Sequence, residues 1–147
     1  MIVGKFGNEM FYVDSQRGIY TPSDLSFEYG KAIETQSTAG SKPISYIGDV
    51  NLIKSSFKLR LDNRFVDVQK KINTWKSMAE GKGLYIYYLG GRFISTNMFV
   101  VTSVKESNIK MNMQGVKIST DLDISVEEYA GNQNSKELNT KPLESYE

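Results

Sequence analysis

The segment that most constrains the fold is residues 63–91, NRFVDVQKKINTWKSMAEGKGLYIYYLGG. Its first half has apolar residues in alternating steps of three and four, which places them on one side of a 3.6-residue helix. These residues are Phe65, Val68, Ile72, Trp75 and Ala79. Asn63 is the predicted N-cap, because its side-chain oxygen can accept a hydrogen bond from an unpaired backbone N–H. Gly81 and Gly83 are expected to end the helix in the left-handed conformation that glycine tolerates. A helix with this stripe packs on a larger structure, and Trp75 is its expected core anchor.

The rest of the chain up to Tyr129 has the pattern of strands and turns. The expected strands cover residues 10–13, 24–34, 44–47, 53–61, 84–89, 92–95, 98–104, 109–113 and 116–126. Residues 53–61 alternate most clearly, with Ser55 as the one polar interruption on the apolar side. Gly90 and Gly91 separate two expected strands and predict a hairpin. Residues 14–22 and 35–42 are predicted to be turns or loops.

These patterns predict an α+β domain. It would consist of mainly antiparallel β-sheets, as two packed sheets or a partly closed barrel, with one amphipathic helix packed on them. The expected domain covers residues 1–130. Residues 131–147 are polar and are predicted to form a flexible tail, because they bury too little apolar surface to offset the entropy of ordering. The tail and the loop at 35–42 are expected to become ordered against neighbouring proteins.

The composition narrows the chemistry that the chain can perform. Cysteine and histidine are both absent, which removes disulfides, thiolate ligands, cysteine nucleophiles and the usual general base near neutral pH. The formal net charge is +1, so no global field favours nucleic acid or an anionic membrane. No apolar run is long enough for a transmembrane helix, and the first residues do not have the pattern of a signal peptide.

Two groups of residues resemble sites of chemistry. Gly81-Lys82-Gly83 resembles a phosphate cradle but follows a helix instead of opening one, so a helix end with a turn is the favoured interpretation. Four carboxylates near the end of the last strand suggest a metal site, but no calcium-loop spacing supports it. They are Asp121, Asp123, Glu127 and Glu128. Asp121 and Asp123 share a strand face with Lys117, Ser119 and Ser125, and a solvated face is the favoured interpretation.

A third group combines aromatic and basic side chains that could stack on single-stranded nucleic acid. It consists of Tyr85, Tyr87, Tyr88, Arg92, Lys70 and Lys71. Tyr85 and Tyr87 have the same strand parity, which suits a stacking surface. The nearby Trp75 and Phe93 supply a hydrophobic layer, so a core or subunit interface is the favoured interpretation. We therefore expect no catalytic, cofactor-binding or metal-binding residues and no enzymatic activity.

The order of these features resembles the gene-product-U (GpU-like) family of small tail proteins from contractile phages and phage-tail-like particles. The resemblance covers about Met1 to Tyr129. It is carried by six segments in order: VGKFGNEMFYV, GSKPISYIG at 40–48, IKSSFKLRL at 53–61, MAEGKG at 78–83, YIYYLGG at 85–91 and MFVVTSVKE at 98–106. The chain departs from the family at residues 95–98, where a further glycine and an aromatic residue are common.

The resemblance implies a non-enzymatic structural subunit of a contractile tail, R-type bacteriocin or contractile injection system, at the junction of baseplate, tube and hub. It implies assembly in the bacterial cytoplasm, and then a place in the virion tail or released particle. The implied partners are tube, hub, sheath and LysM-type tail proteins and further copies of the chain, with no cofactor, membrane or specific nucleic acid. Two alternatives remain: a tail-tube or tube-initiator subunit, for which residues 116–126 would supply a long edge strand, and a β-domain that binds glycan or single-stranded nucleic acid through Tyr85, Tyr87 and Arg92.

Overall fold

The computed structural model describes residues 1–14, 18–37 and 39–130. The predicted tail at 131–147 lies outside these residues. The described chain consists mainly of antiparallel β-sheets with a single short helix, which confirms the predicted α+β class.

Two sheets form the body of the molecule. The first has the strand order β3–β2–β1–β8–β9, and the second has the order β10–β11–β7–β4. The strands of the first sheet are β1 (Ile2–Phe6), β2 (Glu9–Asp14), β3 (Gly18–Tyr20), β8 (Tyr87–Leu89) and β9 (Arg92–Phe93). Those of the second are β4 (Pro22–Glu28), β7 (Lys54–Asp62), β10 (Met98–Met111) and β11 (Lys117–Tyr129). All their pairings are antiparallel.

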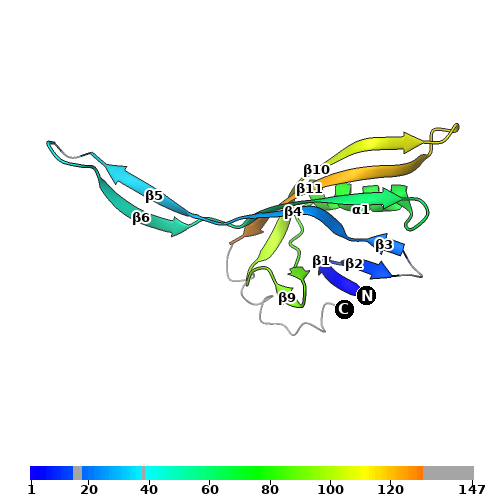
Figure 1. The fold of residues 1–147 in the computed structure, drawn as a ribbon, viewed down its shortest axis with the longest axis horizontal. Coiled ribbons are helices and arrows are strands. Elements are labelled where there is room, and N and C mark those ends of the chain that lie inside the picture. The colour runs from blue at the N-terminus through cyan, green and yellow to red at the C-terminus, as the bar shows by residue number, and fades with distance from the viewer. Residues whose placement is uncertain (15–17, 38, 131–147) are drawn as a thin grey trace.

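A third, two-stranded sheet projects from the body. It pairs β5 (Lys31–Gln36) with β6 (Ile44–Val50), and we call residues 31–50 the arm. Figure 1 shows the arm extending from one end of the long axis, while the β10–β11 hairpin reaches the other end. The sequence predicted one continuous strand at 24–34, which is wrong, because the chain breaks between β4 and β5 at Tyr29 and Gly30. The predicted loop at 35–42 is shorter than expected, since β5 continues to Gln36.

The core lies between the two sheets and the helix. Alternate residues of β7 and β11 point into it, as their period-2 patterns predicted. These buried residues are Phe57, Leu59, Leu61, Leu122, Ile124 and Val126. Ser55 is buried on the same side, and its hydroxyl lies 3.2 Å from the Tyr87 hydroxyl. The buried hydroxyl of Ser55 therefore has a hydrogen-bond partner on the other sheet.

The helix α1 (Val68–Glu80) begins later than its sequence pattern predicted. Asp67 is the N-cap, and its carboxylate accepts a hydrogen bond from the Lys70 N–H at 3.2 Å. The expected cap Asn63 lies instead in a turn held by Asp62, whose carboxylate accepts from the Arg64 N–H at 2.9 Å. Phe65 is consequently outside the helix and 40% exposed, because the Asp62 turn carries it away from the apolar stripe.

The end of the helix also differs from the prediction. Gly81 has φ −87° and ψ −175°, which is extended backbone, so it does not take the left-handed conformation. Its N–H still donates to the Ser77 carbonyl at 2.9 Å and satisfies one terminal acceptor. The apolar face is confirmed for Val68, Ile72 and Trp75, which are buried with Met78, while Ala79 is partly buried.

Trp75 joins all three layers of the core. Its ring lies parallel to that of Phe11 in β2, with centroids 6.5 Å apart, and edge-on to Phe57 in β7 at 6.0 Å. The indole N–H donates to the Tyr20 hydroxyl at 2.8 Å. The predicted role of Trp75 as a core anchor is confirmed, since its side chain is fully buried.

The glycine turn and the long C-terminal hairpin match the sequence in part. Gly90 and Gly91 both have positive φ, as a two-residue hairpin turn requires, so the predicted β8–β9 hairpin is confirmed. The strand expected at 84–89 shortens to Tyr87–Leu89. β3 forms within the segment predicted as turns at 14–22. β11 lies between β10 and β7, so the prediction that residues 116–126 form an edge strand is wrong.

Candidate functional site

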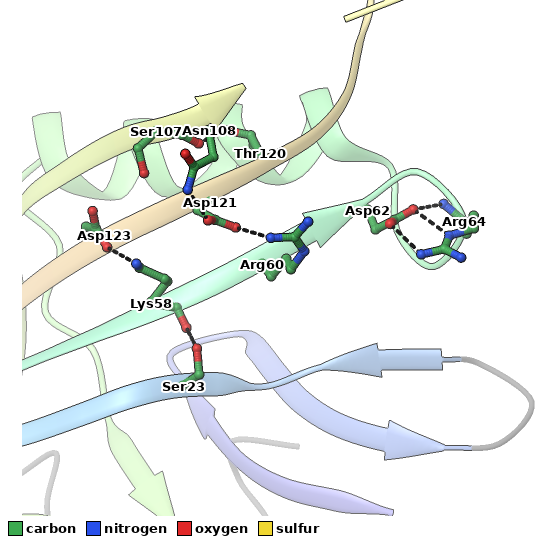
Figure 2. A network of polar contacts seen from close by, with 10 residues as sticks. All are labelled: Ser23, Lys58, Arg60, Asp62, Arg64, Ser107, Asn108, Thr120, Asp121 and Asp123. Carbon is green, nitrogen blue, oxygen red and sulfur yellow. Dashed lines mark hydrogen bonds and ion pairs between the residues drawn. The ribbon is translucent and has the colours of Figure 1, made fainter. Parts of the chain in front are cut away.

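Two of the four carboxylates considered as a metal site, Asp121 and Asp123, form ion pairs with basic side chains on the outer face of the four-stranded sheet (Figure 2). Asp123 lies 3.9 Å from the Lys58 ammonium, and Asp121 lies 3.4 Å from the Arg60 guanidinium. These are the register partners across β11 and β7. Opposite charges directly across strands stabilise a sheet by roughly 0.2–1 kcal/mol. Within the described ranges, no group of three or more carboxylates is arranged to hold a metal ion.

Asp121 differs from the solvated residue that the sequence predicted. It is only 5% exposed, and its second oxygen accepts a hydrogen bond from the Asn108 amide at 2.9 Å. Asn108 has φ 50°, a left-handed conformation that asparagine tolerates better than most residues. It lies where the β10–β11 register shifts between Ser107 and Lys110. Asp121 therefore fixes a bulge that redirects the far end of the hairpin.

Hydroxyl side chains form a row across the same sheet. Ser26 and Ser56 are hydrogen-bonded at 2.7 Å between β4 and β7, and Ser56 is paired in register with Ser125 of β11. The Thr102 hydroxyl donates to the Ser125 carbonyl at 3.0 Å from β10. The row lines an open depression of about 580 Å³. The depression is open and is lined by small polar side chains, so it does not enclose a small molecule as a typical apolar ligand pocket does.

Glu128 ties the end of β11 to neighbouring segments. Its carboxylate accepts hydrogen bonds from the Ser95 hydroxyl, from the Asn97 amide at 3.1 Å and from the Ile53 N–H at 3.1 Å. Burial acts to raise the pKa of Glu128, but these hydrogen bonds outweigh it and hold the pKa below its usual value. Glu128 therefore has a structural role and does not join Asp121 and Asp123 in a site.

The tyrosines weighed as a stacking surface are divided between the core and the opposite face of the sheet. Tyr87 is buried, and burial raises its pKa to about 12. Tyr85 packs against Phe6 with ring centroids 5.5 Å apart, while Tyr88 pairs with the exposed Phe93. The stacking surface through Tyr85 and Tyr87 is thus wrong, and the core interpretation is confirmed for Tyr87.

The lysines of the helix have separate surroundings. Lys71 lies 3.2 Å from the Glu9 carboxylate and 4.7 Å from the Tyr20 ring centroid, which fastens α1 to the five-stranded sheet. Lys76 is exposed and lies 4.0 Å from Glu80, one turn along the helix. Gly81-Lys82-Gly83 follows the C-terminal end of α1, where the helix dipole repels anions, so its position does not favour phosphate.

The arm lies outside the core. Every residue of β5 is exposed, as is every residue of β6 except the half-buried Gly48. Ile33 is directly paired with Ile47 on one face, and Glu34 with Tyr46 on the other. Both faces therefore carry apolar side chains, with Ile47 73% and Val50 80% exposed.

A second exposed apolar surface lies at the far end of the β10–β11 hairpin, and we call residues 109–118 the tip. Its exposed apolar residues are Ile109, Met111, Met113, Val116 and Ile118. The turn is closely held: the Asn112 side-chain oxygen accepts from the N–H groups of Gln114 and Val116, at 2.9 and 3.0 Å. Gly115 has φ 81°, which this turn requires. The tip is therefore a preorganised apolar surface.

The sequence predicted neither the two-stranded arm nor the tip, although it predicted that the loop at 35–42, within the arm, becomes ordered against neighbouring proteins. One signal was present in the arm: apolar residues of opposite parity, Ala32 with Ile33 and Tyr46 with Ile47. Such a strand has no single face to bury in its own domain. In the tip, the alternation of Ile109, Met111 and Met113 resembles an ordinary half-buried strand, so nothing local distinguishes it.

No helix in the described part of the chain is long and apolar enough to cross a membrane.

No family model matches the sequence, and no curated protein matches it significantly. The site is therefore defined by geometry alone, as two projecting apolar ribbons at opposite ends of a β-rich body.

Proposed function

We propose that this chain is a non-enzymatic structural subunit of a contractile phage tail or tail-like particle, acting at the junction of baseplate, tube and hub. The arm and the tip are the observation that carries the proposal. Both expose apolar side chains outside the core, and exposed apolar surface of this kind marks sites of protein–protein contact. The resemblance of six segments to the GpU-like family supports the same role. Neighbours in the particle would be tube, hub, sheath and LysM-type tail proteins.

The test is disruption of the gene in the organism that encodes it, followed by electron microscopy of induced particles. We expect tails without a complete baseplate end, or no tails at all. Wild-type protein supplied in trans should restore them, while a chain carrying Ile33→Asp and Ile47→Asp should restore fewer. An affinity tag on the protein should be found at one end of the tail. Normal tails formed without the gene would contradict the proposal.

A tail-tube or tube-initiator subunit is the second candidate, and one observation favours it. The four-stranded sheet has β4 and β10 at its two edges. Within the described residues, β4 is unpaired on its outer side, and β10 is paired there only at Phe99, which forms a bridge with Tyr85. Copies placed side by side could join β4 to β10 and close into a ring. Stacked rings or tubes in electron micrographs of the purified protein, or a tag found along the whole tail, would favour this candidate over the first.

A further inference from the structure

A buried lysine lies on the outer face of the five-stranded sheet. Phe6 in β1 points into the core, where its ring centroid lies 5.7 Å from that of Trp75. Lys5 precedes Phe6, and successive residues of a strand point to opposite faces, so Lys5 points to the outer face. Its register partners there are Met10 of β2 and Tyr88 of β8. Lys5 is only 6% exposed, whereas most lysines on a sheet surface are open to solvent.

Aromatic and apolar side chains extend from Lys5 across the neighbouring strands. Tyr88 is paired with Phe93 of β9, and their rings meet edge-on with centroids 5.5 Å apart. We call Met10, Lys5, Tyr88 and Phe93 the Lys5 row. Its two ends are 41% and 46% exposed, so the burial is concentrated at the lysine. A buried ammonium is best satisfied by a carboxylate, so this row suits an extended segment that is both acidic and partly apolar.

The chain itself carries a segment of this character beyond Ala130. Residues 142–147, PLESYE, include two glutamates, Glu144 and Glu147, and no basic residue, which gives a formal charge of −2. Leu143 and Tyr146 stand next to these glutamates and supply apolar surface. We call residues 142–147 the acidic segment. It complements the Lys5 row in charge and in apolar character.

The described chain ends close to the edge of this sheet. The Glu128 carboxylate accepts hydrogen bonds from the Ser95 hydroxyl and the Asn97 amide, which holds the end of β11 beside the residues that follow β9. In the sheet order, β1 is the second strand from β9, about 10 Å away at ordinary strand spacing. An extended chain from Ala130 to Glu144 can span about 45 Å. The acidic segment is therefore long enough to reach Lys5 while every described strand stays in place.

We propose that the acidic segment docks along the Lys5 row of its own molecule, where the carboxylate of Glu144 or Glu147 accepts a hydrogen bond from the Lys5 ammonium. Leu143 and Tyr146 then pack on the aromatic and apolar members of the row. This docking closes the outer face of the five-stranded sheet without a neighbouring protein. The inference goes beyond the proposed function, because it concerns the free chain and not its place in a particle.

Cysteine pairs in the full-length chain test the position of the segment, because the sequence has no cysteine of its own. Met10→Cys with Ser145→Cys places one thiol in the Lys5 row and one in the acidic segment. We expect an intramolecular disulfide in dilute protein, identified by peptide mass mapping. Ser103→Cys with Ser145→Cys is the matched control. Ser103 is exposed on the other sheet, a few residues from the pairing of Met98 with Tyr129, so it is also within reach. Without docking at that site, its disulfide should form about tenfold more slowly.

Charge variants of the Met10→Cys, Ser145→Cys protein test the ion pair. Lys5→Met keeps most of the side-chain length and removes the ammonium, while Glu144→Gln with Glu147→Gln removes the two carboxylates. Each change should slow disulfide formation about tenfold, as expected for the loss of a hydrogen bond between charged groups. Glu137→Gln, the same change outside the acidic segment, should leave the rate unaltered. Circular dichroism checks the fold of Lys5→Met, and the glutamine variant alters no residue of either sheet.

Three results would overturn the inference. The first is an equal rate of disulfide formation for the Met10 and Ser103 pairs. The second is an unchanged rate when the carboxylates of the acidic segment are removed. The third is a disulfide that forms mainly between two molecules in dilute protein, which would assign the acidic segment to a second copy of the chain.

Discussion

The Trp75 side chain connects the helix to both sheets of the core. It contacts aromatic rings of both sheets and donates a buried hydrogen bond to Tyr20. We expect Trp75→Ala to lower the free energy of unfolding by about 3–5 kcal/mol, because it opens a large cavity. Urea denaturation followed by circular dichroism measures the change. A loss below about 1 kcal/mol would mean that the surrounding rings collapse into the space.

Phe65→Ala is the matched control for Trp75→Ala. The sequence pattern placed Phe65 on the same apolar stripe, but its side chain is 40% exposed and precedes the helix. Surface substitutions of this kind usually change stability by about 0.5 kcal/mol or less. A cost for Phe65→Ala close to that of Trp75→Ala would contradict the observed start of the helix.

The ionisation of Glu128 makes the stability of the fold depend on pH. Its pKa is lowered from 4.5 in the folded chain, so its hydrogen bonds stabilise the fold fully above the unfolded pKa. This contribution is lost as the pH falls through the folded pKa. We expect Glu128→Gln to cost about 1 kcal/mol at neutral pH, after a discount for partial exposure, and progressively less in acid. The measurement is urea denaturation at several pH values.

The exposed Glu80 provides the comparison for Glu128. Its ion pair with Lys76 is 4.0 Å long and solvent-exposed, so Glu80→Gln is expected to change stability little at any pH. An equal and pH-independent loss in both variants would show that the hydrogen bonds of Glu128 do not depend on its charge.

At the scale of elements, the start of α1 in the structure differs from the start that the sequence pattern predicted. Asp67 caps the helix, whereas Asn63 was the predicted cap. We expect Asp67→Ala to destabilise the chain by about 0.5–2 kcal/mol, because the Lys70 N–H in the first turn of the helix loses its acceptor. Asn63→Ala should be close to neutral, since its backbone N–H keeps its bond to the Ile118 carbonyl. Thermal unfolding of both variants decides between the two caps, and a larger loss for Asn63→Ala would reject Asp67.

The elements that the sequence predicted well are those with one buried face. Buried and less buried residues alternate in β7 and in residues 122–126 of β11, because one side of each strand meets the core. The prediction of a single strand at 24–34 was wrong for the opposite reason. Leu25 and Tyr29 alternate with polar residues but are exposed, and only Phe27 between them packs against the core, so the core face does not continue beyond β4. The short β3 was missed because three residues carry too little periodicity to identify a strand.

The candidate surfaces depend on how elements are placed, which the sequence does not show. Asp121 and Asp123 were identified as residues of interest, but their partners Arg60 and Lys58 lie about 60 residues away and meet them only through the β7–β11 register. Tyr85 and Tyr87 have the parity of a stacking surface, yet Tyr87 is covered by Phe57 and Phe99 from the other sheet. Local patterns cannot distinguish such a covered face from an open one.

At the scale of the whole molecule, the arm should be separable from the body. The Asn51 N–H donates to the Gly30 carbonyl at 2.8 Å, which closes the base of the arm. We expect replacement of residues 31–50 by a short Asn-Gly turn to leave the stability of the body nearly unchanged, because the arm shares no buried side chain with it. Urea denaturation of the shortened and the full-length proteins measures the change, and a large loss of stability would contradict the separation of arm and body.

Hydrogen exchange of the intact chain provides a second check on the arm. Amides of β5 and β6 should exchange much faster than those of β7 and β11 in the isolated protein, because few buried contacts hold the ribbon closed. Equal protection in both regions would mean that the arm is as stable as the body and needs no partner.

The sequence by itself determined the α+β class, the single helix within the described chain with its apolar face, the Gly90–Gly91 hairpin and the buried side of β7. Each of these depends on the period of neighbouring residues, which local backbone geometry translates directly into structure. Tertiary structure decided that Asp121 is buried, that Tyr87 belongs to the core and that the arm and the tip lie outside it. These outcomes depend on which distant segments meet, and burial is a property of both partners.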